Sequence, residues 1–394
     1  MHGTSGSLTS LRQRNREQVL ATLRERGTAS RAEIAKRTGL STSTVSTLIG
    51  ELINELVIVE LDDRPATSSG GRPARMLAFN PSAGGAIGIH LGHDRVQVGV
   101  TDLAGRLVAQ DVTDIDVDHE PAKTLALAAH RALELLERSG VRKDGIVGLG
   151  VAVAAPVFAA TNALGSGPVL ADWRSIDVAD ELARRTGFHV EIGNDANLGA
   201  IDEHRFGVAQ YVDDFIYLML SDGVGAGLVL NGRLYEGALG GAGEIGHVTV
   251  VPDGYVCRCG NRGCLETVAG ASGLAAAFAI TRGPGTTLAD ILRADSAGDG
   301  GTRRVLADAG AAVARALVPV CTVLDPALVV IGGECSASAT LVSAVRDNLA
   351  ASITPLRGSA VPVRASGLGD EAEMLGAIAL ASQRMVLGSA ALAR

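Results

Sequence analysis

The first part of the chain places apolar residues at the spacing of amphipathic helices, between polar residues that start helices and glycines that end them. In the segment 11–26 the apolar residues fall near one helical face, and Gly27 follows as a stop. Ser30, with Glu33 three residues later, forms a capping-box pattern that predicts a second helix over 31–38. Two short helices are therefore expected before residue 40.

A glycine and a serine separate this second helix from a third. Gly39 permits a left-handed cap, and Ser41 can cap a helix that runs from Thr42 to about Asn54. The third helix carries apolar residues that can lock it against the second. Two helices joined by a short turn that contains glycine are typical of a helix-turn-helix.

Two apolar segments follow the helices and flank a polar loop. The segments 56–60 and 76–79 predict strands, and the loop between them covers 62–75. The order of three helices, strand, loop and strand predicts a winged helix-turn-helix over residues 1–80. In that fold the third helix enters the major groove of DNA.

From residue 84 onward the pattern changes to short apolar runs separated by turns, which predicts strands. A first set comprises strands at 86–91, 96–102 and 107–109, a helix over 121–139 and a strand at 146–152. A meander that leads into a βαβ unit indicates an α/β architecture.

A second set of the same kind begins near Asp214. It comprises a strand at 215–220, a glycine-rich turn at 221–227 and a strand at 228–230, after which Asn231-Gly232 is a strong hairpin signal. The chain therefore has two similar α/β halves, and such halves can close on a ligand between them.

Composition agrees with a protein that has more than one domain and a sizeable core. The chain has 394 residues, of which 47% are hydrophobic and 20% charged. We see no run of about eighteen apolar residues without a polar interruption, so no membrane span is expected. The N-terminal residues lack the apolar core of a secretory signal, so we expect a cytoplasmic protein.

The net charge of −8 is unevenly distributed. Residues 1–80 carry 11 Lys and Arg against 8 Asp and Glu, whereas the remaining residues carry 24 against 35. A basic module attached to an acidic body indicates nucleic-acid contact by the N-terminal part alone. The alternative is a small helical module that binds another protein.

Short hydroxyl side chains at the start of the third helix can bond phosphates or base edges. An Arg in the extended Gly-Arg-Pro part of the wing loop suits a narrow minor groove. The residues that we expect to contact DNA are Ser41, Thr42, Ser43, Thr44, Thr47 and Arg72.

Three of the five cysteines cluster within eight residues, which indicates a metal site in a cytosolic chain. Together with a histidine they give the candidate ligands His247, Cys257, Cys259 and Cys264. One imidazole and three thiolates suit a closed, structural and tetrahedral Zn²⁺ site. Gly260 and Gly263 let the loop turn tightly. The alternative is a set of reduced cysteines on a loop.

Two stretches of the body resemble the signature of the ROK family, named for repressors, open reading frames and kinases. They are Glu236–His247, which contains Gly-Gly-Ala-Gly-Glu-Ile-Gly-His, and Cys257–Glu266, which contains Cys-Gly-Asn-Arg-Gly-Cys-Leu-Glu. The winged helix with its Gly-Arg-Pro wing resembles the repressor branch.

The resemblance implies a two-lobed sugar-kinase fold of the actin and hexokinase type, with ribonuclease H-like lobes. We expect a first lobe over 81–195 and a second lobe, with the zinc loop, over 196–375. A C-terminal helix over about 376–394 is expected to return to the first lobe.

The resemblance also implies which residues bind sugar hydroxyls. They are Asn194, Asp195, Glu244, His247 and Glu266. Asn194 and Asp195 end a strand that enters a helix, where α/β folds hold ligands. His247 is expected to bind zinc through one ring nitrogen and to face the sugar with the other. The alternative is a helix cap for the first pair and a loop carboxylate for Glu266.

Three departures from the family's kinases argue against ATP chemistry. In the first strand turn, His90 replaces the metal-proximal aspartate and Asp94 replaces a hydroxyl. Asp222 replaces a hydroxyl in the second glycine-rich turn, and the turn at 331–334, which resembles the family's adenosine-side turn, ends in Glu334. Carboxylates beside phosphates repel them. We therefore expect no catalytic residue, although Asp195 stands where the kinases have their base.

The sequence thus predicts a sugar-responsive DNA-binding regulator, a repressor, with a degenerate kinase-like effector domain and structural Zn²⁺. The expected partners are an operator DNA, a sugar or sugar derivative, and a second copy in a homodimer or a tetramer. One alternative is an ATP-dependent hexose or amino-sugar kinase with a DNA-binding head. Another is a constitutive DNA-binding protein whose body only dimerises.

Overall fold

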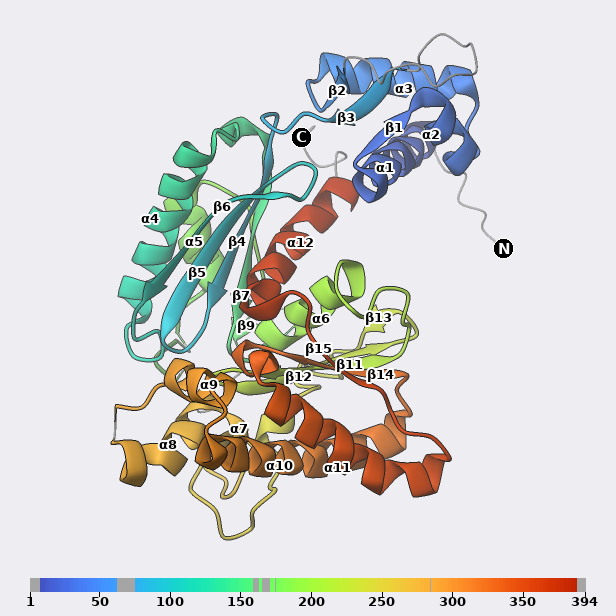
Figure 1. The fold of residues 1–394 in the computed structure, drawn as a ribbon. Coiled ribbons are helices and arrows are strands. Elements are labelled where there is room, and N and C mark those ends of the chain that lie inside the picture. The colour runs from blue at the N-terminus through green and yellow to red at the C-terminus, as the bar shows by residue number, and fades with distance from the viewer. Residues whose placement is uncertain are drawn as a thin grey trace.

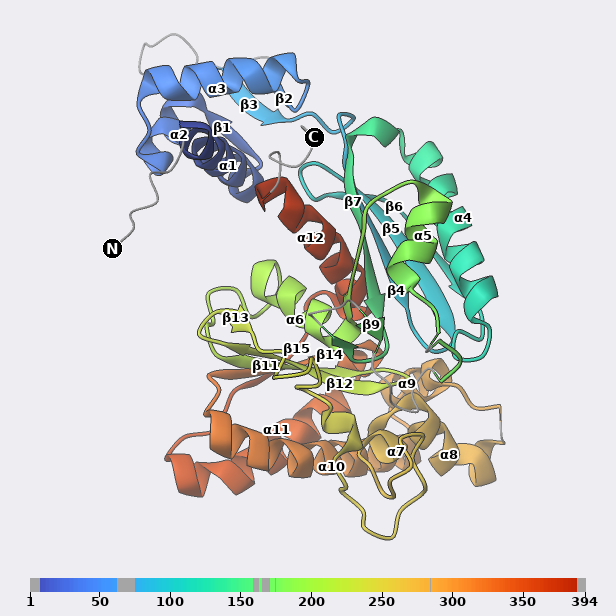
Figure 2. The same cartoon turned by 180° about the vertical axis from the view of Figure 1, so that it is seen from behind.

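A computed structural model describes residues 8–61, 75–158, 163–164, 171–173, 175–283 and 285–387. These residues form a small N-terminal domain and two larger lobes, each built on its own sheet (Figure 1). One long helix at the C-terminal end runs between the lobes and toward the N-terminal domain (Figures 1 and 2).

The N-terminal domain is a winged helix-turn-helix, as the sequence predicts. Its elements are α1 (Leu8–Arg26), β1 (Thr28–Ser30), α2 (Arg31–Thr38), α3 (Thr42–Asn54), β2 (Ile58–Leu61) and β3 (Met76–Phe79). The capping box of Ser30 and Glu33, the left-handed Gly39 and the Ser41 cap are all confirmed. The short strand β1 is not predicted, and it completes a sheet of order β1-β3-β2.

The predicted strand at 56–60 starts too early. Leu56 has a φ of 62° and Val57 donates its backbone N–H to the Leu52 carbonyl, so both residues belong to the end of α3. The chain turns there before it extends into β2.

The first lobe is a mixed sheet of order β10-β7-β4-β5-β6 with helices on its outer face (Figure 2). Its elements are β4 (Gly85–Leu91), β5 (Arg95–Asp102), β6 (Leu107–Asp114), α4 (Pro121–Ser139), β7 (Ile146–Val153), α5 (Val178–Thr186) and β10 (Val190–Asn194). A two-stranded ribbon of β8 (Val157–Phe158) and β9 (Ala163–Leu164) extends from it.

The second lobe repeats this strand order, β13-β12-β11-β14-β15. Its elements are α6 (Asp195–Arg205), β11 (Phe215–Leu220), β12 (Val224–Leu230), β13 (Arg233–Leu234), α7 (Glu266–Ala269), α8 (Ala271–Arg282), α9 (Leu288–Ser296), α10 (Gly300–Leu324), β14 (Leu328–Gly332), α11 (Ala339–Arg357) and β15 (Val363–Ala365). In each lobe an antiparallel meander is followed by two parallel strands. The predicted pair of similar halves is confirmed.

Two helices fill the space between the sheets. Helix α12 (Ala372–Leu387) packs on β4 and β7 of the first lobe and on α6, while α6 packs on β11 and β12 of the second. Gly227 of β12 permits the close contact, because a Cβ there would lie 2.6 Å from the Ala196 carbonyl oxygen of α6. Of the predicted glycine-rich turn at 221–227, only Ser221–Gly223 forms a turn, and the remaining residues belong to β12.

Helix α10 is long and apolar enough, by length and composition, to cross a membrane. Half of its apolar window is buried inside the fold. It packs against α11, and its buried side chains belong to the core of the second lobe. The helix therefore has the environment of a core helix.

The N-terminal domain meets the first lobe at the tip of the hairpin between β5 and β6. Leu103 and Ala104 of this tip join the core of the N-terminal domain. Beside the tip lies a cavity of about 550 Å³, lined by Ala21 of α1, by the ends of the first sheet and by α12. The joint between domain and body is therefore incompletely filled.

Candidate functional site

The five residues that the resemblance assigns to sugar binding lie around one small cavity between the lobes. Its volume is about 40 Å³. Ligand pockets typically have volumes of about 300–1,000 Å³. The site is therefore narrow in this conformation.

Asn194 and Asp195 lie where β10 ends and α6 begins. The Asn194 side-chain oxygen caps the helix by accepting from the Asn197 N–H at 3.0 Å, and its Nδ2 donates to the Ala155 carbonyl and to Asp195. Asp195 is 3% exposed, and its Oδ1 accepts from the Ala196 N–H at 2.7 Å. The side chain of Asn194 is thus used largely to start the helix and to orient Asp195.

The second oxygen of Asp195 faces a histidine. Nε2 of His90 lies 3.8 Å from Oδ2 of Asp195, and Nδ1 of His90 lies 3.1 Å from Gln97 Oε1. Against the effect of burial, Asp195 and the charge of Glu373 raise the pKa of His90. A protonated His90 places a positive charge between two carboxylates.

Glu373 connects this group to α12. It lies in the first turn of the helix, is 2% exposed and accepts a 2.8 Å hydrogen bond from the Tyr217 hydroxyl of β11. Burial raises the pKa of Glu373 to about 7. The start of α12 is thereby tied to both lobes directly beneath Asp195.

Glu244, His247 and Glu266 approach the cavity from the second lobe. Glu244 precedes the short helix Ile245–His247, which His247 ends, and Nε2 of His247 lies 3.7 Å from Oε2 of Glu244. Glu266 opens α7, and its Oε2 accepts from the Val224 N–H at 3.2 Å. Burial, and then the charges of Asp195 and Glu266, raise the pKa of Glu244 to about 7.

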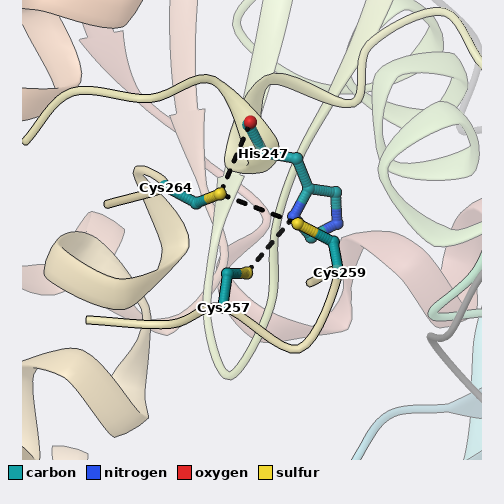
Figure 3. A group of neighbouring side chains, drawn as sticks. All are labelled: His247, Cys257, Cys259 and Cys264. Carbon is teal, nitrogen blue, oxygen red and sulfur yellow. Dashed lines mark hydrogen bonds between the residues drawn. The ribbon is translucent and has the colours of Figure 1, made fainter. Parts of the chain in front are cut away.

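His247 also belongs to a cluster with the three cysteines (Figure 3). One ligand atom from each of His247, Cys257, Cys259 and Cys264 lies within 4.8 Å of all the others. The sulfurs of Cys259 and Cys264 are 3.7 Å apart, and Nδ1 of His247 lies 3.6 Å from the Cys257 sulfur. A tetrahedral Zn²⁺ separates two thiolates by about 3.8 Å and a thiolate and a nitrogen by about 3.5 Å.

The cluster therefore fits a tetrahedral metal. Gly260 and Gly263 have φ angles of 89° and 68°, so the predicted glycine turns of this loop are confirmed. Burial raises the pKa of the Cys264 thiol to about 12, so a metal that binds must displace its proton. With Nδ1 of His247 in the cluster, its Nε2 is the nitrogen that faces Glu244.

Sequence reasoning missed Arg258, which lies between two of the cysteines. Its Nε is 2.9 Å from Oε1 of Glu266, and its Nη1 is 3.4 Å from Oδ2 of Asp118 in the first lobe. The signal in the sequence is only that Arg258 shares a tight loop with metal ligands. Its partners are distant in sequence and come together only in the fold.

On the other side of Asp195 lies the region where the resemblance to the family's kinases places the phosphates. A cavity of about 30 Å³ is lined by five carboxylates, those of Asp94, Asp195, Asp222, Glu334 and Glu373. Arg95, the arginine of this cavity, forms ion pairs with Asp94 and Glu334. Burial, and then the hydrogen bond and charge of Asp94, raise the pKa of Asp222 to about 7.

The predicted DNA-contacting residues of α3 lie together on its first turns. Ser41, Thr42, Ser43 and Thr47 are exposed and Thr44 is half-buried. The Ser41 hydroxyl bonds those of Ser43 and Thr44 at 2.9 and 2.8 Å. Arg72 lies outside the described residues. At the base of the wing, Glu60 pairs with Arg31 and Arg75.

Two family models match the chain. The model of the ROK family matches residues 86–384, and a model described as winged helix-turn-helix DNA-binding matches residues 12–58. The chain is 30% identical to the xylose repressor of Bacillus spizizenii over 363 residues, which cover 92% of this chain and 93% of the repressor.

Two crystal structures share the fold. A ROK family transcriptional regulator, a homologue of the E. coli MLC protein, is 25% identical with a TM-score of 0.70 and covers 95% of this chain and 97% of its own. A ROK family glucokinase from Streptomyces griseus, in complex with glucose and AMPPNP, is 25% identical with a TM-score of 0.66. It covers 76% of this chain and 99% of its own. The predicted kinase-like fold of the body is confirmed.

Proposed function

Because the chain belongs to the ROK family and carries a winged helix-turn-helix ahead of the family domain, we propose that it is a sugar-responsive transcriptional repressor. The proposal is carried by two features found in one chain. The first is a helix with exposed hydroxyl side chains that can contact DNA. The second is a family sugar site beside which carboxylates and a paired arginine occupy the region expected for the nucleotide phosphates. The likeness to a xylose repressor over almost the whole chain supports the same function.

The body senses sugar without phosphorylating it. Phosphoryl transfer needs a cradle for the phosphates and Mg²⁺ near the reacting groups. Here Arg95 is paired with Asp94 and Glu334 in place of phosphates, and a histidine faces Asp195 where the kinases place an aspartate. Asp195 therefore binds a hydroxyl and has no transfer to catalyse.

The effector is an unphosphorylated sugar. A phosphate on the sugar would meet five carboxylates around a cavity of about 30 Å³, with the arginine there already paired. Like charges at short range in a poorly solvated site oppose such binding strongly. D-Xylose is the first candidate, because it gives its name to the similar repressor.

Zn²⁺ is the proposed metal, and its role is structural. His247, Cys257, Cys259 and Cys264 would hold it, and the metal would fix the loop that carries Glu266 and Arg258. Through the second nitrogen of His247 the metal site would also orient a sugar contact. The protein would act in the cytoplasm as a homodimer or tetramer whose paired α3 helices read paired half-sites.

Helix α12 is the proposed route from sugar to DNA. Its first turn holds Glu373 beneath Asp195, and its other end approaches α1 of the DNA-binding domain (Figure 1). A sugar that changes the angle between the lobes would move α12 and with it the DNA-binding domain. If the sugar binds one arrangement of the lobes more tightly than the other, it shifts the population toward that arrangement and so changes the affinity for DNA.

The test is fluorescence anisotropy on DNA from the protein's own promoter region, at fixed salt, since phosphate contacts make affinity salt-dependent. D-Xylose, glucose, N-acetylglucosamine and their phosphates are titrated. We expect a neutral sugar to weaken DNA binding about tenfold, or about 1.4 kcal/mol of coupling. Glu244→Ala should bind DNA normally and ignore the sugar. Absence of DNA binding refutes the regulator, and a response to phosphates alone refutes the effector class.

A further inference from the structure

We propose that Arg258 is an autoinhibitory latch of the sugar site: it holds Glu266, bridges the two lobes across the narrow cleft, and must be displaced when a sugar binds. This inference rests on the proposed function, because it takes the cleft to be the sugar site. It assigns a regulatory role to a residue outside the family's sugar contacts and metal ligands.

Arg258 reaches both sides of the cleft from the metal loop. It contacts Glu266 of its own lobe at 2.9 Å and Asp118 of the first lobe at 3.4 Å. The side chains of Arg258, Asp118 and Glu266 are 29%, 26% and 8% exposed. Water and salt weaken ion pairs less when the partners are partly buried. The bridge therefore holds the lobes together more firmly than a surface pair would.

His93 of the first lobe completes the bridge. Nη1 of Arg258 lies 3.1 Å from Nδ1 and 3.3 Å from Nε2 of His93. A nitrogen at nearly equal distance from both ring nitrogens lies over the ring and not along one lone pair, so Nη1 of Arg258 contacts the face of the imidazole. Nδ1 of His93 then donates to Oδ1 of Asp118 at 2.7 Å. Asp118 is thus held from two sides.

The cleft is narrow while this bridge is in place. The cavity of about 40 Å³ is far below the roughly 300–1,000 Å³ of typical ligand pockets. Both oxygens of Glu266 are engaged, Oε1 by Arg258 and Oε2 by the Val224 N–H. A sugar hydroxyl that donates to Oε1 competes with Arg258, and its entry requires the lobes to part.

The latch therefore lowers the fraction of protein that can accept sugar. Apparent affinity falls in proportion to the fraction of the competent state. Weakening the bridge to Asp118 should raise sugar affinity, although Asp118 lies outside the set of proposed sugar contacts. If Arg258 or Asp118 instead contributed binding energy to the sugar, the same substitutions would lower the sugar affinity.

The test compares Asp118→Asn and Arg258→Gln with two matched controls. Asp116→Asn changes an exposed neighbour that bonds His119, and Arg262→Gln changes an arginine of the same metal loop that bonds the Gly254 carbonyl. D-Xylose affinity is measured by isothermal titration calorimetry, and metal content is checked for each protein. We expect the two latch variants to bind about three- to tenfold more tightly and the controls to match the wild type.

Small-angle X-ray scattering without sugar gives a second readout. The latch variants should show a larger radius of gyration than the wild type, and the controls should not. If Asp118→Asn leaves the affinity or the radius unchanged, or weakens binding, the latch is refuted. If the wild type binds none of the sugars, the effector proposal fails, while the scattering still decides whether Arg258 and Asp118 hold the lobes together.

Discussion

Replacing Asp202 by asparagine should stabilise the protein, and more so as the pH rises. Asp202 lies on α6, is 1% exposed, and its Oδ2 has no hydrogen-bond partner among the described residues. Burial, and then the charge of Glu203, raise its pKa to about 8, against 3.8 for an ordinary aspartate. At neutral pH the folded protein therefore keeps this carboxyl protonated.

The raised pKa of Asp202 determines how its contribution to stability changes with pH. A carboxyl whose pKa is higher in the folded state binds its proton more tightly there, so its contribution to stability is complete below about pH 4. The contribution is lost as the pH rises through about 8. One unit of pKa difference between the folded and unfolded states is worth about 1.4 kcal/mol, so the ceiling is about 6 kcal/mol. Local relaxation and water entry reduce this to about 2–3 kcal/mol.

The assay is chemical denaturation followed by circular dichroism, at pH 5 and pH 9. Asp202→Asn should be about 2–3 kcal/mol more stable than the wild type at pH 9, and the difference should shrink toward pH 5. Asp308→Asn, an exposed change on α10, is the matched control and should leave the pH dependence unaltered. If the stability of Asp202→Asn depends on pH as the wild type's does, or is lower than the wild type's at pH 9, the carboxyl of Asp202 is ionised and solvated.

Three further predictions concern the sites. Cys259→Ser should lose the metal by elemental analysis, melt at lower temperature and respond weakly to sugar, because the loop with Glu266 is no longer fixed; retention of one metal per chain contradicts the ligand assignment. Asp195→Asn should abolish the sugar response in the anisotropy assay and keep wild-type DNA affinity, and a retained response rejects its role. Ser43→Asp should weaken DNA binding at least about tenfold by repelling phosphate, with sugar affinity unchanged; intact DNA binding would remove this helix from the interface.

Local signals made much of the fold predictable. Ser30 and Ser41 start helices through hydrogen bonds that span three residues, and such bonds can be read directly from the sequence. The spacing of the cysteines predicted a cluster that the fold does bring together. Strand β1 was missed because its three residues carry no pattern of their own and pair with β3 across the chain.

Long-range contacts made the rest unpredictable. The pairing of Arg95 with Glu334 joins residues of different lobes, and neither position signals the other. The sequence indicated carboxylates beside the missing phosphates but not the arginine that already pairs with two of them. Similarly, Asn194 was assigned to the sugar by resemblance, whereas most of its hydrogen-bonding capacity starts α6 and orients Asp195.

The joint between the DNA-binding domain and the body has a consequence for how the regulator can change. The domain rests on Leu103 and Ala104 beside a largely apolar void of about 550 Å³. Tightly packed interfaces resist new side-chain volume, but an unfilled one can accept it with little loss of stability. A residue larger than the void can hold would shift the resting angle of the DNA-binding domain. The strength of regulation can therefore evolve at this joint while both binding surfaces stay as they are.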